Sequence, residues 1–175
     1  MTNEPGSGDD TGRDDLVRAD GSAAESETGG GADERTWEPR PVPEVTPETE
    51  AFWRGASEGR FLLSECQECG LIYHYPRALC PDCFGEDVTW REASGEGEIY
   101  SYSIARQASG WPDEALPLVV AYVELEEGPR VMTNVLDCEP EDVAVGTPVE
   151  TRFVPTEKED VSIPVFVPCD SRGRE

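Results

Sequence analysis

The feature that most constrains the fold of this chain is a pair of C-x2-C units separated by ten residues. Each unit can form a tight turn that points two thiolates at one metal ion, and Gly70 follows the first unit directly. Four thiolates complete the tetrahedral shell that zinc prefers and leave no coordination position for water or substrate. The spacing therefore predicts a closed, structural zinc site whose ligands are Cys66, Cys69, Cys80 and Cys83.

Two other uses of these cysteines remain open. An iron site of the rubredoxin type is the chemical alternative, since tetrahedral sulfur ligation suits iron as well as zinc. Disulfide pairing is disfavoured, because paired C-x2-C units in a chain without an export signal are typical of metal binding. A segment of about 30 residues with few core side chains does not fold alone, so metal binding should supply its folding energy.

The other candidates for chemistry form no catalytic set. His74, the single histidine, lies outside the first cysteine pair and is expected to have a surface or packing role. Cys138 stands between two acidic residues, which raise a thiol pKa, and Cys169 lies near the C-terminus, so both are expected to be inert. The sequence has no G-x-S-x-G elbow, phosphate-binding loop or nucleotide fingerprint. No catalytic residue is predicted, and the cofactor-contacting residues are unknown.

The charge of the chain is strongly acidic. Asp and Glu number 38 against 14 Lys and Arg, which gives a formal charge of −24, and Lys158 is the single lysine. Residues 92–175 alone contain 18 acidic and 6 basic residues, a charge of −12. Repulsion between the acidic side chains opposes a compact state in dilute buffer. At molar salt the Debye length falls to about 3 Å, so this repulsion is screened. We therefore expect a cytoplasm rich in salt, with an ordinary acidic soluble protein as the alternative.

Targeting and membrane segments are not recognisable in the sequence. The first residues lack the basic and apolar regions of a signal peptide. No stretch approaches the roughly 18 apolar residues of a membrane span. A cytoplasmic location without membrane contact is therefore expected.

Composition divides the chain into five parts. Residues 1–43 are predicted to be a disordered acidic tail, up to about residue 36, and then a stiff proline-rich connector. A helix within 44–60 precedes a zinc ribbon over 61–91. A barrel over 92–170 and a frayed tail over 171–175 complete the chain.

The predicted helix has recognisable ends. Thr46 is the expected N-cap and Pro47 occupies the first helical position, and the helix should end at about Ser57. Its apolar stripe is expected to pack on its own domain, with docking onto a partner as the alternative. That stripe consists of Phe52, Trp53 and Ala56.

Beyond the cysteines the hydrophobic period changes to two, which predicts strands. Val119, Ala121, Val123 and Leu125 share one face of one such strand. Five short strands without a long helix among them predict a small closed barrel, since closure removes exposed edges. The predicted strands are Glu98–Arg106, Leu118–Leu125, Arg130–Asp137, Thr147–Val154 and Ser162–Val167.

The order of these motifs resembles that of a known family. A helix ending in a Glu-Gly turn is followed by C-x2-C-G, Tyr-Pro-Arg and C-P-x-C, and then by a barrel carrying PLVVAYVEL, VGTPV and IPVFVP. This combination resembles the acyl-CoA-associated family that joins a rubredoxin-like zinc ribbon to an OB-fold, first catalogued as a domain of unknown function. The resemblance covers about residues 46–168. One departure is His74-Tyr75-Pro76-Arg77, where the family often has an aromatic-Pro-Pro-Arg run.

The resemblance implies a mainly β fold, with a short N-terminal helix, a four-cysteine zinc ribbon and a five-stranded OB-fold barrel. It also implies a noncatalytic accessory subunit that binds a thiolase-superfamily enzyme. Archaeal members resemble the bridge between acetoacetyl-CoA thiolase and hydroxymethylglutaryl-CoA synthase, in which the barrel helps to enclose coenzyme A. Zinc is then the chain's own cofactor, and coenzyme A or acyl-CoA is shared with the partner.

Two other functions are weighed against this one. Zinc ribbons and OB-folds both occur in proteins that bind single-stranded nucleic acid, but phosphate contacts need clustered Lys or Arg, which the acidic barrel region lacks. Independent catalysis on acyl thioesters would have to use Cys138. For docking onto a partner enzyme, the candidate surfaces are the stripe at Phe52 and Trp53 and the loop around Trp111.

Overall fold

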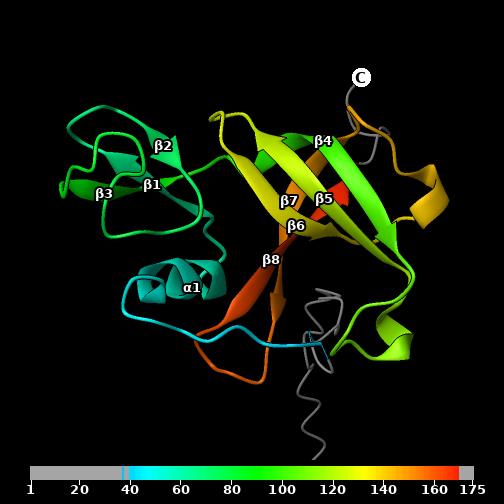
Figure 1. Cartoon of the computed structure of the whole chain (residues 1–175). Coiled ribbons are helices and arrows are strands. Elements are labelled where there is room, and N and C mark those ends of the chain that lie inside the picture. Colours follow the sequence, from blue (N-terminus) through cyan, green and yellow to red (C-terminus); the bar gives the residue numbers. More distant parts are fainter. Residues whose placement is uncertain (1–36, 38–39, 170–175) are drawn as a thin grey trace, which may run out of the picture. The chain divides into compact units, whose positions relative to one another are not determined.

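Along the described part of the chain, a short helix leads into a three-stranded sheet and then into a closed five-stranded barrel (Figure 1). The computed structural model describes Trp37 and residues 40–169, all within the unit Glu34–Glu175. The predicted tail over 1–36 and the predicted frayed end over 171–175 lie outside the described residues. The predicted mainly β fold class is confirmed.

The helix α1, Glu50–Ser57, begins later than the sequence predicted. The prediction of Thr46 as N-cap is wrong, because a turn over residues 47–49 comes first and Thr49 precedes the helix. The Thr49 hydroxyl accepts a hydrogen bond of 3.0 Å from the Thr46 N–H, so the two threonines close this turn on each other. The predicted end at Ser57 is confirmed.

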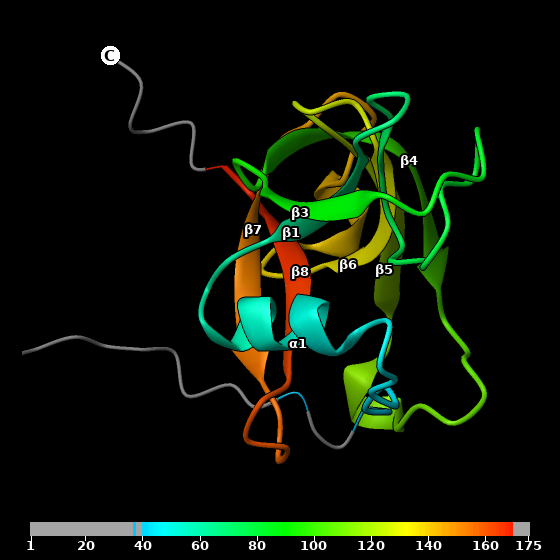
Figure 2. The same ribbon diagram turned by 90° about the vertical axis from the view of Figure 1, so that its left-hand side faces the viewer.

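The apolar stripe of α1 is buried inside the chain's own core. Phe52, Trp53 and Ala56 are all buried, and α1 lies against β8 and β7 (Figure 2). A Cβ on Gly55 would lie 2.6 Å from the Leu62 side chain, so glycine is what lets the helix approach the next strand closely. The stripe thus packs on its own domain as expected, and Phe52 and Trp53 are wrong as a docking surface.

The three-stranded sheet presents the first cysteine at a strand end. Strand β1, Leu62–Cys66, lies between β2, Ile72–Tyr73, and β3, Val88–Glu92, and both pairings are antiparallel. Leu62 and Leu63 are buried, whereas most of β3 is exposed. The sheet is therefore too small to hold its shape by apolar burial alone.

The barrel closes in the strand order β4-β5-β6-β8-β7. The pairing of β6 with β8 is parallel and the other four pairings are antiparallel, and β4 meets β7 to complete the circle. Closure leaves each strand with two neighbours and no exposed edge. The strands are β4, Glu96–Ala105; β5, Leu118–Leu125; β6, Arg130–Val135; β7, Pro148–Pro155; and β8, Ser162–Pro168. Two single turns of 3-10 helix, Asp113–Ala115 and Pro140–Asp142, lie in the connections.

Each barrel strand lies within two residues of its prediction at either end. The predicted inward face of β5 is confirmed, since Val119, Ala121, Val123 and Leu125 are all buried. Strand β8 departs from simple alternation, because three consecutive residues, 165–167, are buried. The reason is that α1 covers the face of β8 that would otherwise meet solvent.

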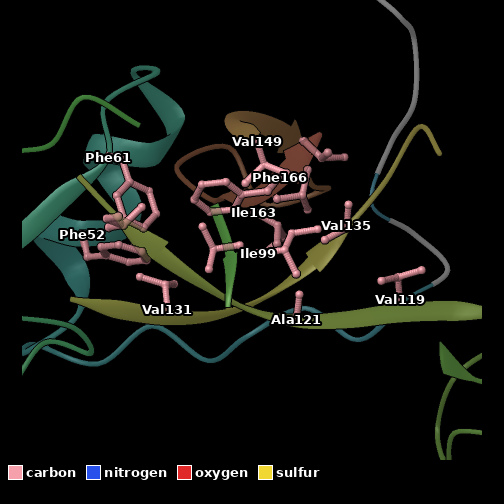
Figure 3. Packing of buried hydrophobic residues seen from close by; sticks show 14 of the residues in the cluster. Phe52, Phe61, Ile99, Val119, Ala121, Val131, Val135, Val149, Ile163 and Phe166 are labelled. Atoms are coloured by element: carbon pink, nitrogen blue, oxygen red, sulfur yellow. The ribbon is translucent and has the colours of Figure 1, made fainter. Parts of the chain in front are cut away.

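An aromatic contact joins the barrel to the segments before it. Phe61, directly before β1, packs edge-on against Phe52 at 5.8 Å and against Phe166 of β8 at 6.1 Å between ring centroids. Figure 3 shows Phe52 and Phe61 meeting this end of the barrel core. Helix, ribbon and barrel therefore share one hydrophobic cluster.

The connector before α1 also contributes to this cluster. Trp37 is only 4% exposed, and its ring meets Trp111 edge-on at 5.8 Å. Its backbone N–H donates a hydrogen bond of 2.9 Å to Pro155 O at the end of β7. Sequence reasoning did not predict this burial. The loop around Trp111 is thus partly covered by the chain itself.

No helix within the described residues is both long and apolar enough to cross a bilayer.

Candidate metal centre

The fold brings the sulfur atoms of the four predicted ligands together. The Sγ atoms of Cys66 and Cys83 are 3.6 Å apart, as are those of Cys69 and Cys80, and all four lie within 4.8 Å of one another. A tetrahedral zinc ion with Zn–S bonds of about 2.3 Å requires sulfurs about 3.8 Å apart. A disulfide requires about 2.05 Å, so the spacing fits a metal ion and not a disulfide. The four residues can therefore hold a zinc ion.

Two equivalent turns present the four thiols. In the first, the Gly70 N–H donates to Cys66 O at 2.9 Å, and in the second the Phe84 N–H donates to Cys80 O at 3.1 Å. The donor residue has a positive φ in both turns, 76° at Gly70 and 62° at Phe84. This backbone conformation is open to glycine but costs about 1–2 kcal/mol for a residue with a Cβ.

Polar contacts tie the first turn to the second. The Glu68 carboxylate accepts a hydrogen bond of 3.1 Å from the Glu86 N–H, and the Gln67 N–H donates to Asp87 O at 2.8 Å. Glu68 lies directly over Gly85, where a Cβ would come within 2.3 Å of the carboxylate. The two turns are therefore held to each other by backbone groups as well as by the sulfur cluster.

The surroundings of the cluster favour the thiolate form of Cys80. Cys66 and Cys80 are buried, whereas Cys69 and Cys83 face solvent. Hydrogen bonds from the backbone N–H groups of Cys83 and Asp82 lower the pKa of Cys80 to about 7. Metal binding needs deprotonated thiols, so Cys80 is ready to bind near neutral pH.

His74 packs in an aromatic cluster and is not a ligand. Its ring stacks on Phe61 at 5.9 Å and lies 5.2 Å from each of Phe52 and Tyr75. The Nδ1 atom is buried without a hydrogen-bond partner among the described residues. Burial lowers the pKa of His74 to about 4, so the ring is neutral at physiological pH. The expected packing role is confirmed.

The two remaining cysteines lie outside the cluster. Cys138 is half-buried in the barrel region, and its pKa is raised by burial and by the nearby carboxylates of Asp137 and Glu139. Cys169 is half-buried just beyond the end of β8. A thiol with a raised pKa is a poor nucleophile, as the sequence predicted for Cys138.

Sequence reasoning missed two residues at the centre. Glu68 supports the second turn, and Phe84 takes the conformation that Gly70 takes in the first. Aligning the two C-x2-C units would have pointed to Phe84, because it follows the second unit as Gly70 follows the first.

We expect Cys66→Ser or Cys80→Ser to release the metal and unfold the ribbon, because three thiolates cannot close the shell. The measurements are metal content per chain by elemental analysis, with zinc and iron determined separately, and thermal unfolding. Cys138→Ser is the matched control and should keep one ion per chain. A ligand variant with full metal content and an unchanged melting curve would contradict the site.

Burial of His74 also predicts a pH dependence of stability. The unfolded chain takes up a proton near pH 6.5, whereas the folded chain does so only near pH 4. Stability from this group is therefore complete above pH 6.5 and decreases as the pH falls towards 4, by up to about 3 kcal/mol. Its neighbours Phe52 and Phe61 have no ionisable group.

The control for this effect is His74→Phe, which keeps a ring in the cluster but cannot be protonated. The free energy of unfolding of both proteins should be measured between pH 7 and 4.5 by denaturant titration. Acid release of the metal affects both proteins alike, so the difference between them isolates His74. Parallel pH profiles would show that His74 is accessible to protons in the folded chain.

Comparison with known proteins agrees with this geometry. A family model for the rubredoxin-like zinc ribbon domain of ChsH2 matches residues 53–89, and one for the C-terminal OB-fold domain of ChsH2 matches residues 90–154. The chain is 37% identical over 103 residues to a DUF35 domain-containing scaffold protein of Methanocaldococcus jannaschii, covering 58% of this chain and 73% of that one.

Two further relatives are named as enzymes or parts of enzymes. A probable enoyl-CoA hydratase alpha subunit of Thermomonospora curvata is 33% identical over 130 residues, which are 74% of this chain but only 40% of the relative. A solved structure described as an Ltp2-ChsH2(DUF35) aldolase superimposes with a TM-score of 0.64 at 31% identity, covering 73% of this chain and 98% of that one. The four-thiol ribbon, the closed barrel and these matches show that the chain belongs to the DUF35 family, in which a ChsH2-type zinc ribbon precedes an OB-fold domain.

Proposed function

We propose that this chain is a noncatalytic accessory subunit that binds a thiolase-superfamily enzyme and helps to hold its acyl-CoA. A bridge between acetoacetyl-CoA thiolase and hydroxymethylglutaryl-CoA synthase is the specific form of this proposal. We also propose that the subunit is divided into the helical segment 44–60, the zinc ribbon 61–91 and the OB-fold 92–170. The observation that carries the proposal is the four-thiol cluster, whose closed shell leaves a metal ion no position for a reactant.

The residues that could act as a catalytic base or nucleophile support an accessory role. The single histidine of the chain, His74, is enclosed by aromatic rings and has a lowered pKa, which leaves it poorly placed to take protons from a substrate. Cys138 has a raised pKa and lies among carboxylates. A thiol nucleophile needs the opposite environment, with a base or a cation beside it.

The names of the relatives support a partner enzyme. The archaeal relative is named a scaffold protein, and the similar solved structure combines ChsH2(DUF35) with Ltp2 as an aldolase. The hydratase alpha subunit is much longer than the matched region, so its activity is said of that whole protein. The scaffold and aldolase names fit a chain that works with another protein, and the hydratase name contributes a CoA thioester substrate.

A groove between α1, the ribbon and the barrel suits an amphipathic ligand such as acyl-CoA. Its volume is about 510 Å³, and it is lined by aromatic side chains together with Arg77 and Arg130. The Nε1 of Trp53 and the Nδ1 of His74 are buried there without hydrogen-bond partners among the described residues. Apolar walls can take an acyl chain or pantetheine arm, and the arginines can pair with phosphates.

Arg77 is the more available of the two arginines. Among the described residues it forms no ion pair, whereas Arg130 pairs with Glu124 at 2.6 Å and lies over the Tyr100 ring. In a chain of charge −24, a cation without a carboxylate beside a groove favours an anionic ligand.

Binding of single-stranded nucleic acid is the alternative function. Tyr100, Tyr102 and Tyr122 are exposed on β4 and β5, and aromatic side chains on a barrel can stack with bases. The neighbouring cation, Arg130, is already neutralised by Glu124. The net charge of −12 over residues 92–175, which include the barrel, disfavours a phosphate backbone. Retention on single-stranded DNA at molar salt would reverse this ranking.

The proposal predicts a stable complex. Affinity-tagged chain isolated from its native host at molar salt should carry a thiolase-superfamily polypeptide, identified by mass spectrometry. The purified chain alone should show no turnover of acyl-CoA. The Cys66→Ser variant, with its ribbon unfolded, should lose the polypeptide. A clean monomer, or thioester conversion by the isolated chain, would overturn the proposal.

We also propose that the chain works in a salt-rich cytoplasm, on the strength of its charge. Potassium chloride at molar concentration should raise the melting temperature relative to dilute buffer, because screening removes the repulsion between carboxylates. An equimolar neutral osmolyte is the control and should raise it less. A melting temperature that is independent of salt would indicate an ordinary acidic protein.

A further inference from the structure

The two cysteine turns differ at one position that matters for folding. Gly70 after the first pair and Phe84 after the second both have positive φ values, 76° and 62°. Their N–H groups make the same hydrogen bond to the first cysteine of each pair. Glycine takes this conformation freely, whereas phenylalanine is strained in it. The second turn therefore holds a residue that its own backbone disfavours.

The Phe84 ring gives the fold nothing in return for this strain. It is 73% exposed, more than any other large apolar side chain among the described residues. None of the aromatic contacts in the described part of the chain includes it. A strained residue with an unpacked aromatic side chain points to a role outside the folded chain.

The turn presents this ring rigidly. The Cys80 N–H donates a hydrogen bond of 3.0 Å to Gly85 O, and the Phe84 N–H donates one of 3.1 Å to Cys80 O. The backbone on both sides of the turn is therefore fixed. The adjacent thiols of Cys80 and Cys83 belong to the sulfur cluster. An aromatic side chain on a pre-organised turn loses little conformational entropy on binding, which is typical of an interface anchor.

The charge around the ring indicates what it can meet. Asp82 and Glu86 are exposed within two residues of it, and Glu68 lies over the neighbouring Gly85. Four thiolates with one zinc ion add a net charge of about −2. No basic residue occurs between Cys80 and Asp87. A complementary surface would have an apolar pocket with Lys or Arg at its rim.

We propose that Phe84 is the anchor by which this chain docks on its partner enzyme, inserting into an apolar pocket with a basic rim. This inference rests on the proposed function, since it names the surface used by the proposed accessory subunit. The metal centre would then both stabilise the folded ribbon and keep the Phe84 side chain exposed for binding.

The test uses Phe84→Gly in the full chain, with the partner polypeptide identified in the isolation described above. Glycine relieves the backbone strain, so the variant should keep one metal ion per chain and melt at the same temperature or higher. Its affinity for the partner should fall at least about tenfold, as is usual for a truncated aromatic anchor. Phe84→Tyr should retain binding. The control Val145→Ser, at another exposed apolar residue of the barrel region, should change neither property.

A photoreactive phenylalanine at position 84 provides the second measurement. The cross-linked peptide should come from the partner enzyme and contain apolar residues together with Lys or Arg. If Phe84→Gly binds as tightly as the unaltered chain, or if the cross-link joins a second copy of this chain, the anchor is wrong while the accessory role stands. If the unaltered chain has no partner, both proposals fail.

Discussion

The convergence of four sulfur atoms is the constraint on which the ribbon depends. The three strands β1, β2 and β3 contain few buried side chains beyond β1, and residues 77–87, between β2 and β3, are mostly exposed. Apolar burial of this size is small compared with the entropy of ordering the chain. Thiols that close around one ion replace the missing core, and the two turns that carry them are bonded to each other through Glu68 and Gln67.

The ribbon is in turn joined to the barrel by aromatic packing. Phe61 stands at the junction, between Phe52 of α1 and Phe166 of β8. His74 is part of this cluster. Its ring stacks on Phe61, and burial among apolar rings favours its neutral form. The ribbon and the barrel core are therefore connected through these four rings, and a change on either side is expected to affect the other.

The same arrangement is the basis of our proposal that a partner enzyme carries out the chemistry. The four clustered thiols, the histidine among aromatic rings and the Cys138 thiol with its raised pKa are each poorly suited to act on a substrate. Two surfaces are available to other molecules, an aromatic groove lined in part by Arg77 and a turn that exposes Phe84. Both surfaces depend on the ribbon being folded, which makes the metal a structural requirement for the proposed function.

The sequence by itself determined the cysteine cluster and the barrel strands. Both are encoded over short distances, by the spacing of C-x2-C pairs and by alternation such as that of Val119, Ala121, Val123 and Leu125. Only the tertiary structure decided the burial of Trp37 and His74, the loss of Phe52 as a docking surface, and the later start of α1. These depend on contacts between residues far apart in the chain, such as Trp37 with Trp111 and Phe61 with Phe166, which no local pattern specifies. Phe84 belongs partly to each class, because the sequence aligns it with Gly70, whereas its positive φ is seen only in the closed turn.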